Sequence, residues 1–160
     1  MDDAPKTAKF LGILETLLLH RVEFAVVGDV VAQLAGAPTG TLKLEILYPP
    51  SPENVVALFA ALHELRARYR SPAGRDFEPD LEKLATKRTH LLMTDLGALD
   101  ALSAIGYGLT YGDLVDRMRP YDLRNLEVRV LDLAAVIESK EHANRDKDRA
   151  ALPVLRQTLG

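Results

Sequence analysis

The pattern of hydrophobic and polar residues predicts several amphipathic helices. Apolar residues recur at helical spacing over 5–19, and again after Ser51 and Pro52, where the order of a capping serine and a proline is typical of a helix start. We expect this second helix to run to about residue 69. Further helices are predicted over 29–36, 110–118, 133–143 and 147–159, with one helical turn over 79–85.

Short apolar or alternating runs predict the strands. They cover 24–28, 42–48, 89–94, 98–103 and 126–131. The three residues 95–97 end in glycine, so the third and fourth runs should form a hairpin. This order of elements predicts an α/β (α+β) fold with a small mixed sheet flanked by helices and with helices at the C-terminal end. We expect one domain over 1–160.

The strand predicted over 42–48 places unlike residues on its two faces. Strand side chains alternate, so Leu42, Leu44 and Ile46 share one face, while Lys43 and Glu45 share the other. A solvated face on a half-buried strand would explain the lysine and the glutamate without further chemistry.

On another predicted strand, a charged residue interrupts an apolar row. Ala98, Asp100 and Leu102 share one face of the strand over 98–103. A carboxylate buried there requires a partner, whereas an exposed edge position requires none.

Composition narrows the classes of function only a little. The chain has 160 residues, of which 48% are hydrophobic and 27% charged, with a net charge of −3. This balance does not indicate a nucleic-acid binder, although it allows a local basic groove. Cysteine is absent, which excludes disulfides and thiolate metal sites. Neither a signal peptide nor an apolar run of membrane-spanning length is visible, so we expect a cytoplasmic protein.

Four segments carry a resemblance to a known family. They are VVGDVVAQLAGAPTGTLKLEI (26–46), PENVVALFAALHELRARYR (52–70), LLMTDLGALDALS (91–103) and VRVLDLAAVIESKEHANRDKDRAALPVL (128–155). Together they resemble the nucleotidyltransferase (polymerase-beta-like) superfamily, and most of all its small bacterial branch related to abortive-infection AbiE-type toxins. Such a resemblance implies the nucleotidyltransferase fold, a nucleoside triphosphate as ligand and Mg²⁺ as cofactor.

The resemblance also implies a set of site residues. Glu45 and Asp100 correspond to metal-binding carboxylates, and these two with Lys140 would be the catalytic candidates. The nucleotide-binding candidates are Gly28, Asp29, Lys43, Lys147 and Asp148. In such a site two Mg²⁺ ions about 4 Å apart clamp the attacking and leaving oxygens, and a lysine neutralises phosphate charge.

Several positions depart from the family pattern. Asp29 stands where the pattern has a small residue, Thr39 where it has arginine, and Ala35 where many relatives have histidine. Lys43 replaces the first metal-binding aspartate and Glu45 the second. Glutamate can still bind Mg²⁺, whereas lysine has donors and no acceptor. We therefore predict that Lys43 forms an ion pair with Asp29, with Glu45 or with both.

Simpler interpretations remain beside these assignments. Asp29 could serve only as a helix N-cap, and the stretch with Lys140, Lys147 and Asp148 could be a solvated helix face. The four histidines show no metal-ligand spacing.

Three functions are compatible with the sequence. The first is a pseudoenzyme that keeps the fold, has a degenerate two-metal site and binds a nucleotide or a protein partner. The second is an active, toxin-like Mg²⁺-dependent transferase that moves a nucleotide from a nucleoside triphosphate to an RNA such as tRNA or to a protein. The third is an assembly or regulatory protein, for example a homo-oligomer, with a vestigial pocket. A membrane partner is not expected.

Overall fold

The structure is a computed structural model that describes residues 3–38, 43–70 and 77–160. Its helices are α1 (Asp3–Leu19), α2 (Asp29–Leu34), α3 (Pro52–Glu64), α4 (Leu81–Thr86), α5 (Tyr111–Leu114), α6 (Leu133–Ala143) and α7 (Asp146–Leu159), with a 3₁₀ turn over Val115–Arg117. The strands are β1 (Ala25–Val27), β2 (Lys43–Leu47), β3 (Arg68–Tyr69), β4 (Thr89–Thr94), β5 (Gly97–Leu102), β6 (Ala104–Ile105), β7 (Leu109–Thr110), β8 (Met118–Leu123) and β9 (Leu126–Leu131). Leu42 and Thr39 lie outside the described residues.

Seven of these strands form one mixed sheet, in the order β3-β4-β5-β2-β1-β9-β8. β5 pairs with β2, and β1 with β9, in parallel, while the remaining neighbours are antiparallel. β6 and β7 form a separate small hairpin. The predicted mixed α/β fold is confirmed.

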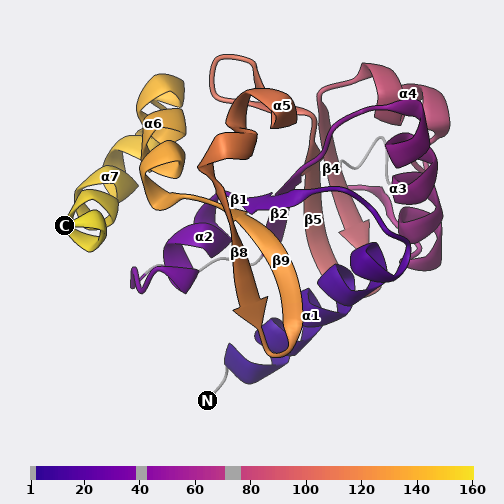
Figure 1. Ribbon diagram of the computed structural model, residues 1–160, viewed down its shortest axis with the longest axis horizontal. Coiled ribbons are helices and arrows are strands. Elements are labelled where there is room, and N and C mark those ends of the chain that lie inside the picture. The colour runs from indigo at the N-terminus through magenta and orange to yellow at the C-terminus, as the bar shows by residue number, and fades with distance from the viewer. Residues whose placement is uncertain (1–2, 39–42, 71–76) are drawn as a thin grey trace.

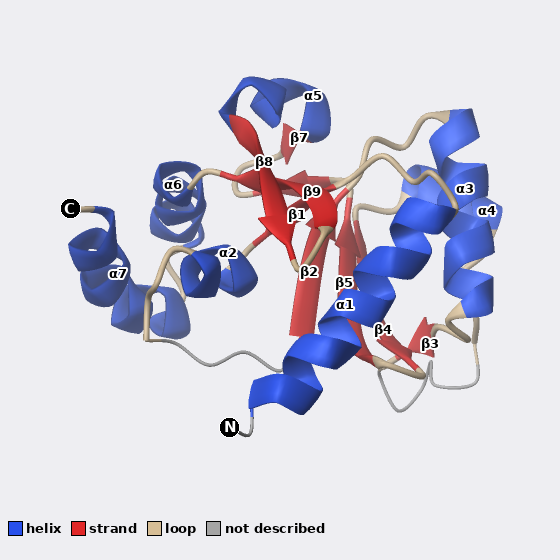
Figure 2. Ribbon diagram, turned by 60° about the horizontal axis from the view of Figure 1, so that its bottom comes forward, coloured by secondary structure: helices blue, strands red, loops and turns tan. Residues whose placement is uncertain are grey.

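Most of the helices lie in two groups, and α5 lies apart from both (Figures 1 and 2). α3 and α4 pack beside the β3–β4–β5 half of the sheet, and α1 packs against α3 and β9. α2, α6 and α7 gather at the other end, where a small apolar cluster joins them; its buried members are Ala32, Ala37, Ile137, Leu152 and Leu155. None of the helices in the described part of the chain combines the length and the apolarity that a membrane span requires.

Local signals explain most of the element boundaries. Ser51 accepts a hydrogen bond from the backbone N–H of Asn54, and Pro52 begins α3, as predicted. Thr110 and Asp113 form the predicted capping box, and Asp132 caps α6 through the N–H of Ala135.

Several elements differ from the prediction, among them the helix predicted over 110–118, where α5 ends at Leu114 and the 3₁₀ turn ends at Arg117. α3 ends at Glu64, and the chain turns through Arg66, which has φ of 55°, into β3, so the helix does not reach residue 69. β8 is a strand that the sequence did not predict, because Pro120 and the polar residues around it weaken the strand pattern. Asp29 is the first residue of α2 and not its cap, since Gly28 holds the N-cap position and has no side chain to accept a hydrogen bond.

Candidate functional site

Lys43, Glu45 and Asp100 lie on one face of two adjacent parallel strands. Glu45 of β2 is directly paired with Asp100 of β5, and Lys43 precedes Glu45 by two residues. The alternation of strand side chains therefore turns all three to the same side. The alternate residues Leu44 and Leu99 face the helix-covered core and are fully buried.

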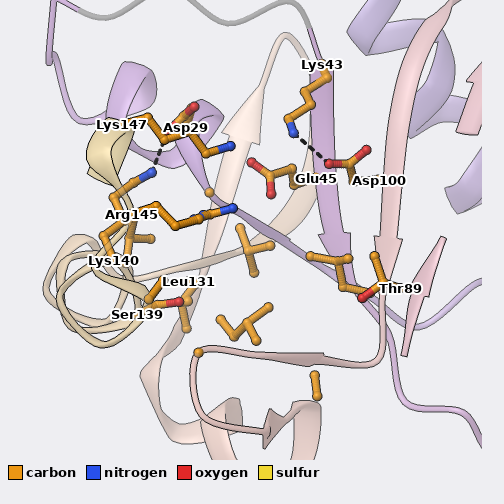
Figure 3. A pocket seen from close by; sticks show the side chains of 18 of the residues that line it. Asp29, Lys43, Glu45, Thr89, Asp100, Leu131, Ser139, Lys140, Arg145 and Lys147 are labelled. Atoms are coloured by element: carbon orange, nitrogen blue, oxygen red, sulfur yellow. Dashed lines mark ion pairs between the residues drawn. The ribbon is translucent and has the colours of Figure 1, made fainter. Parts of the chain in front are cut away.

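This face of the sheet forms one side of a pocket of about 560 Å³ (Figure 3). The other side comes from the start of α2 and from α6 and α7. Seven charged residues line the pocket: Asp29, Lys43, Glu45, Asp100, Lys140, Arg145 and Lys147. Four of them are cations and three are carboxylates, so the pocket is rich in both signs of charge.

Asp100 is buried between two cations. Its side chain is 3% exposed, with Lys43 Nζ 2.9 Å from Oδ2 and Arg70 Nη2 2.8 Å from Oδ1. The Arg70 contact is an ion pair without hydrogen-bond alignment, so Oδ1 accepts no aligned hydrogen bond. Asp100 is therefore not an exposed edge residue. Its charge is compensated from both sides, as burial of a carboxylate requires.

The partner of Lys43 differs from the sequence prediction. We expected Asp29 or Glu45, and the structure pairs Lys43 with Asp100. Asp29 forms its ion pair with Lys140, whose Nζ lies 2.9 Å from Oδ1. The sequence alone could not show that β2 and β5 are adjacent, which is what brings Lys43 to Asp100.

Glu45 reaches back over the glycine at the start of α2. A Cβ atom added to Gly28 would collide with the Glu45 carboxylate, and Gly28 has φ of +73°, a conformation that favours glycine. Burial raises the pKa of Glu45, although the nearby Lys43 opposes the shift. Neighbouring Asp100 and Asp29 raise it further. A carboxyl group that resists ionisation thus lies at the centre of the pocket.

The C-terminal candidates form the opposite wall. Asp148 is fully buried and binds Arg145, with Nε 2.7 Å from Oδ2, while Lys140 Nζ lies 3.8 Å from Oδ1. Burial raises the pKa of Asp148, but the hydrogen bonds from Arg145 outweigh burial and leave that pKa lowered. Asp148 and the largely buried Lys140 are therefore not part of a solvated helix face.

The pocket brings together the residues singled out from the sequence. Gly28, Asp29, Lys43, Glu45, Asp100, Lys140 and Lys147 all line it, with Asp148 directly behind Lys140. Two further cations were missed. Arg70 follows a strand that the sequence did not predict, and Arg145 stands in a charged run in which nothing distinguishes it. Figure 3 shows Arg145 extending from the corner between α6 and α7 toward Glu45.

By sequence, the chain matches no family model and no curated protein. Two solved structures are similar in shape. One is the crystal structure of TM1012 from Thermotoga maritima, provisionally assigned as a nucleotidyltransferase, with a TM-score of 0.59 and 16% identity over 90% of this chain and 88% of that one. The chain has a nucleotidyltransferase fold. The other is the solution structure of the antibiotic-resistance factor ANT(2'')-Ia, with a TM-score of 0.64 and 14% identity over 99% of this chain and 86% of that one.

A nucleotidyltransferase fold raises the question of Mg²⁺ binding. Among the described residues, no group of three or more histidine or carboxylate side chains could hold a metal ion. Asp100 has one oxygen beside Lys43 and the other beside Arg70, so a metal at Asp100 would have to displace a cation. The arrangement of Glu45 and Asp100 does not fit the hard oxygen ligand set that Mg²⁺ requires.

Proposed function

We propose that this protein binds a nucleotide in the charged pocket and is impaired in nucleotidyl transfer. The observation that supports this most strongly is the contact between Lys43 and Asp100, at 2.9 Å. It puts an ammonium group against the carboxylate that the family resemblance assigns to metal binding. A positive charge is thus already present on this face, but it cannot coordinate a reacting oxygen as a metal does.

The other wall supplies groups for the phosphates of the ligand. Lys140, Arg145 and Lys147 line the pocket from α6, α7 and the corner between them. Asp148 is buried behind this wall and holds Arg145, which orients the guanidinium before a ligand arrives. Guanidinium and ammonium groups are the side chains that bind phosphate oxygens most strongly.

Glu45 affects how well an anion is tolerated. An ionised carboxylate in the centre of the pocket would repel phosphate, and the raised pKa of Glu45 reduces that repulsion. Gly28 carries no side chain, and the Glu45 carboxylate occupies the space where a side chain would stand. We therefore expect nucleotide binding that does not require Mg²⁺.

Thermal unfolding with each of the four nucleoside triphosphates tests this, in EDTA and in Mg²⁺. A ligand of the native state raises the melting temperature according to its affinity. We expect a rise in EDTA at least as large as that in Mg²⁺, and a smaller rise for Lys43→Gln. The matched control is Lys87→Gln, which removes an exposed lysine after α4, away from the pocket.

A second candidate is an active transferase, and the raised pKa of Glu45 favours it. A carboxyl group poised closer to neutral pH is suited to act as a general base toward an acceptor hydroxyl. Incubation of the protein with labelled nucleoside triphosphates and cell extract distinguishes the active transferase from the impaired enzyme. Mg²⁺-dependent transfer that is lost in Glu45→Gln would overturn the impaired-enzyme proposal. The absence of any melting response to all four nucleotides would overturn nucleotide binding and favour a protein partner.

A further inference from the structure

Two aromatic side chains meet beside the charged pocket. Tyr107 lies between β6 and β7, and His142 lies in the last turn of α6. Their ring centroids are 4.6 Å apart, with the planes inclined at 60°. Tyr107 is 64% exposed, which is high for a large aromatic residue in a rigid turn. Exposed aromatic rings beside a polar pocket are candidates for contact with a flat ligand.

The neighbours of both rings line the pocket itself. Ile105 and Gly106 directly precede Tyr107. Ser139 lies three residues before His142, and Ala143 directly follows it. All four of these neighbours line the pocket. His142 follows Ser139 by three residues, so the two share one face of α6. The aromatic pair therefore lies at the rim of the pocket and not on a remote surface.

The turn that carries Tyr107 is fixed against α6. Gly106 has φ of +60° and Gly108 φ of +93°, conformations that favour glycine. A Cβ added to Gly106 would lie 3.5 Å from Ser139 Oγ, so the turn backbone packs on the helix. Tyr107 is thus presented at a defined place relative to the helix that also carries Lys140.

We propose that Tyr107 and His142 form a stacking surface for the base of the bound nucleotide. This inference rests on the proposed nucleotide binding. Lys140 and His142 are two residues apart on α6 and therefore point to different sides of the helix, Lys140 into the pocket and His142 toward Tyr107 beside it. Every nucleobase has an aromatic face, so stacking on tyrosine or histidine tolerates all four bases. The ligand class is therefore a nucleotide with its base intact, and not phosphate alone.

Titration calorimetry in EDTA with ATP and with inorganic tripolyphosphate tests the assignment. Stacking of a base on one aromatic ring contributes to the binding free energy, so we expect Tyr107→Ala to weaken ATP binding roughly tenfold. Tripolyphosphate has no base, so its affinity should not change. Tyr107→Phe keeps the ring and should bind ATP like the wild type. Tyr121→Ala is the matched control, since Tyr121 is an exposed tyrosine of β8 outside the pocket.

Each other outcome overturns the stacking surface in a recognisable way. Unchanged ATP affinity in Tyr107→Ala, with both ligands bound, rejects the stacking and leaves the phosphate pocket intact. An equal loss for both ligands shows that Tyr107 only holds the turn in place, and the melting temperature of the variant would confirm that cause. If wild-type protein binds neither ligand, the proposed nucleotide binding itself has failed.

Discussion

The two faces of the central sheet are built from the same strands and differ completely in content. On the face covered by α1, α3 and α4, β2, β4 and β5 contribute Leu44, Ile46, Leu92, Leu99 and Ala101, all fully buried. On the pocket face, β2 and β5 contribute Lys43, Glu45 and Asp100. Neighbouring residues along one strand thus serve either the core or the pocket.

The polar groups on the two faces are also stabilised differently. His90, on the covered face, lies 2.9 Å from the hydroxyl of Tyr69 through Nδ1, and 3.1 Å from the carbonyl oxygen of Lys87 through Nε2. Burial lowers its pKa, although the Lys87 carbonyl opposes the shift. On the covered face, the buried His90 therefore has neutral hydrogen-bond partners. On the pocket face, the buried Asp100 has cations as its partners. The first arrangement favours folding, and the second keeps charge available for a ligand.

Replacing Leu99 with alanine should have the largest effect on this comparison. Leu99 lies between Leu44 and Leu92 in the sheet, and all three are fully buried. Loss of the side chain should lower the free energy of unfolding by roughly 3 kcal/mol, through lost burial and the cavity left behind. Denaturant unfolding measures this. Nucleotide affinity of the folded variant should stay the same, and a parallel loss of affinity would mean that the two faces are not independent.

Replacing Asp100 with alanine should have the next largest effect on stability. The change leaves Lys43 and Arg70 close together without their shared carboxylate. Because both cations are partly exposed, we expect a loss of about 2 kcal/mol, less than for a fully buried pair. Asp95→Ala is the control: Asp95 is half exposed and pairs with Arg66 at 3.7 Å, so its loss should cost less than about 0.5 kcal/mol. If both variants lost the same free energy of unfolding, the burial of Asp100 would contribute nothing to the strength of its ion pairs.

Replacing Glu45 with glutamine should have the smallest effect, and one that depends on pH. Burial raises the pKa of Glu45 in the folded protein, so the unfolded chain loses this proton first as pH rises above about 4.5. The stability contributed by the protonated carboxyl is complete below that pH and is lost as pH rises through the folded pKa. Glutamine stays neutral, so the variant should be more stable than wild type near pH 7, by on the order of 1 kcal/mol, and the difference should shrink toward pH 4.5.

Unfolding of both proteins between pH 4.5 and 8 measures the difference. Glu138→Gln is the control with the opposite sign, because the hydrogen bond from Arg117 lowers the pKa of Glu138. That variant should be less stable than wild type near neutral pH, and the deficit should fall as the solution is acidified. A Glu45→Gln variant that is destabilised at pH 7 would contradict the role assigned to burial.

Much of the architecture follows from local signals in the sequence. The short apolar run in 89–94 and the alternation in 126–131 predict β4 and β9, and the caps at Ser51 and Asp132 place the starts of α3 and α6. These patterns are set by residues within a few positions of one another. β3 escapes prediction because it has two residues, too few to show alternation.

The pairing of charges in the site is harder to predict. Asp100 could be singled out as a buried carboxylate in need of a partner, but its partners come from β2 and from Arg70 beyond β3. Which strands become neighbours depends on the topology of the whole sheet, and no local pattern carries that information. Lys140 approaches Asp148 for the same reason, through packing of α6 against α7, whereas the contact of Arg145 with Asp148 is local to the start of α7.

The contact between Gly28 and Glu45 limits how these two positions can change over generations. A side chain at 28 must displace the Glu45 carboxylate, which lies at the end of a flexible side chain and can move aside. Even then the backbone at 28 keeps its positive φ, which still favours glycine. The two positions are therefore constrained unequally: the Glu45 side chain can adapt to a change at 28, whereas the backbone of the turn at 28 cannot adapt without being rebuilt.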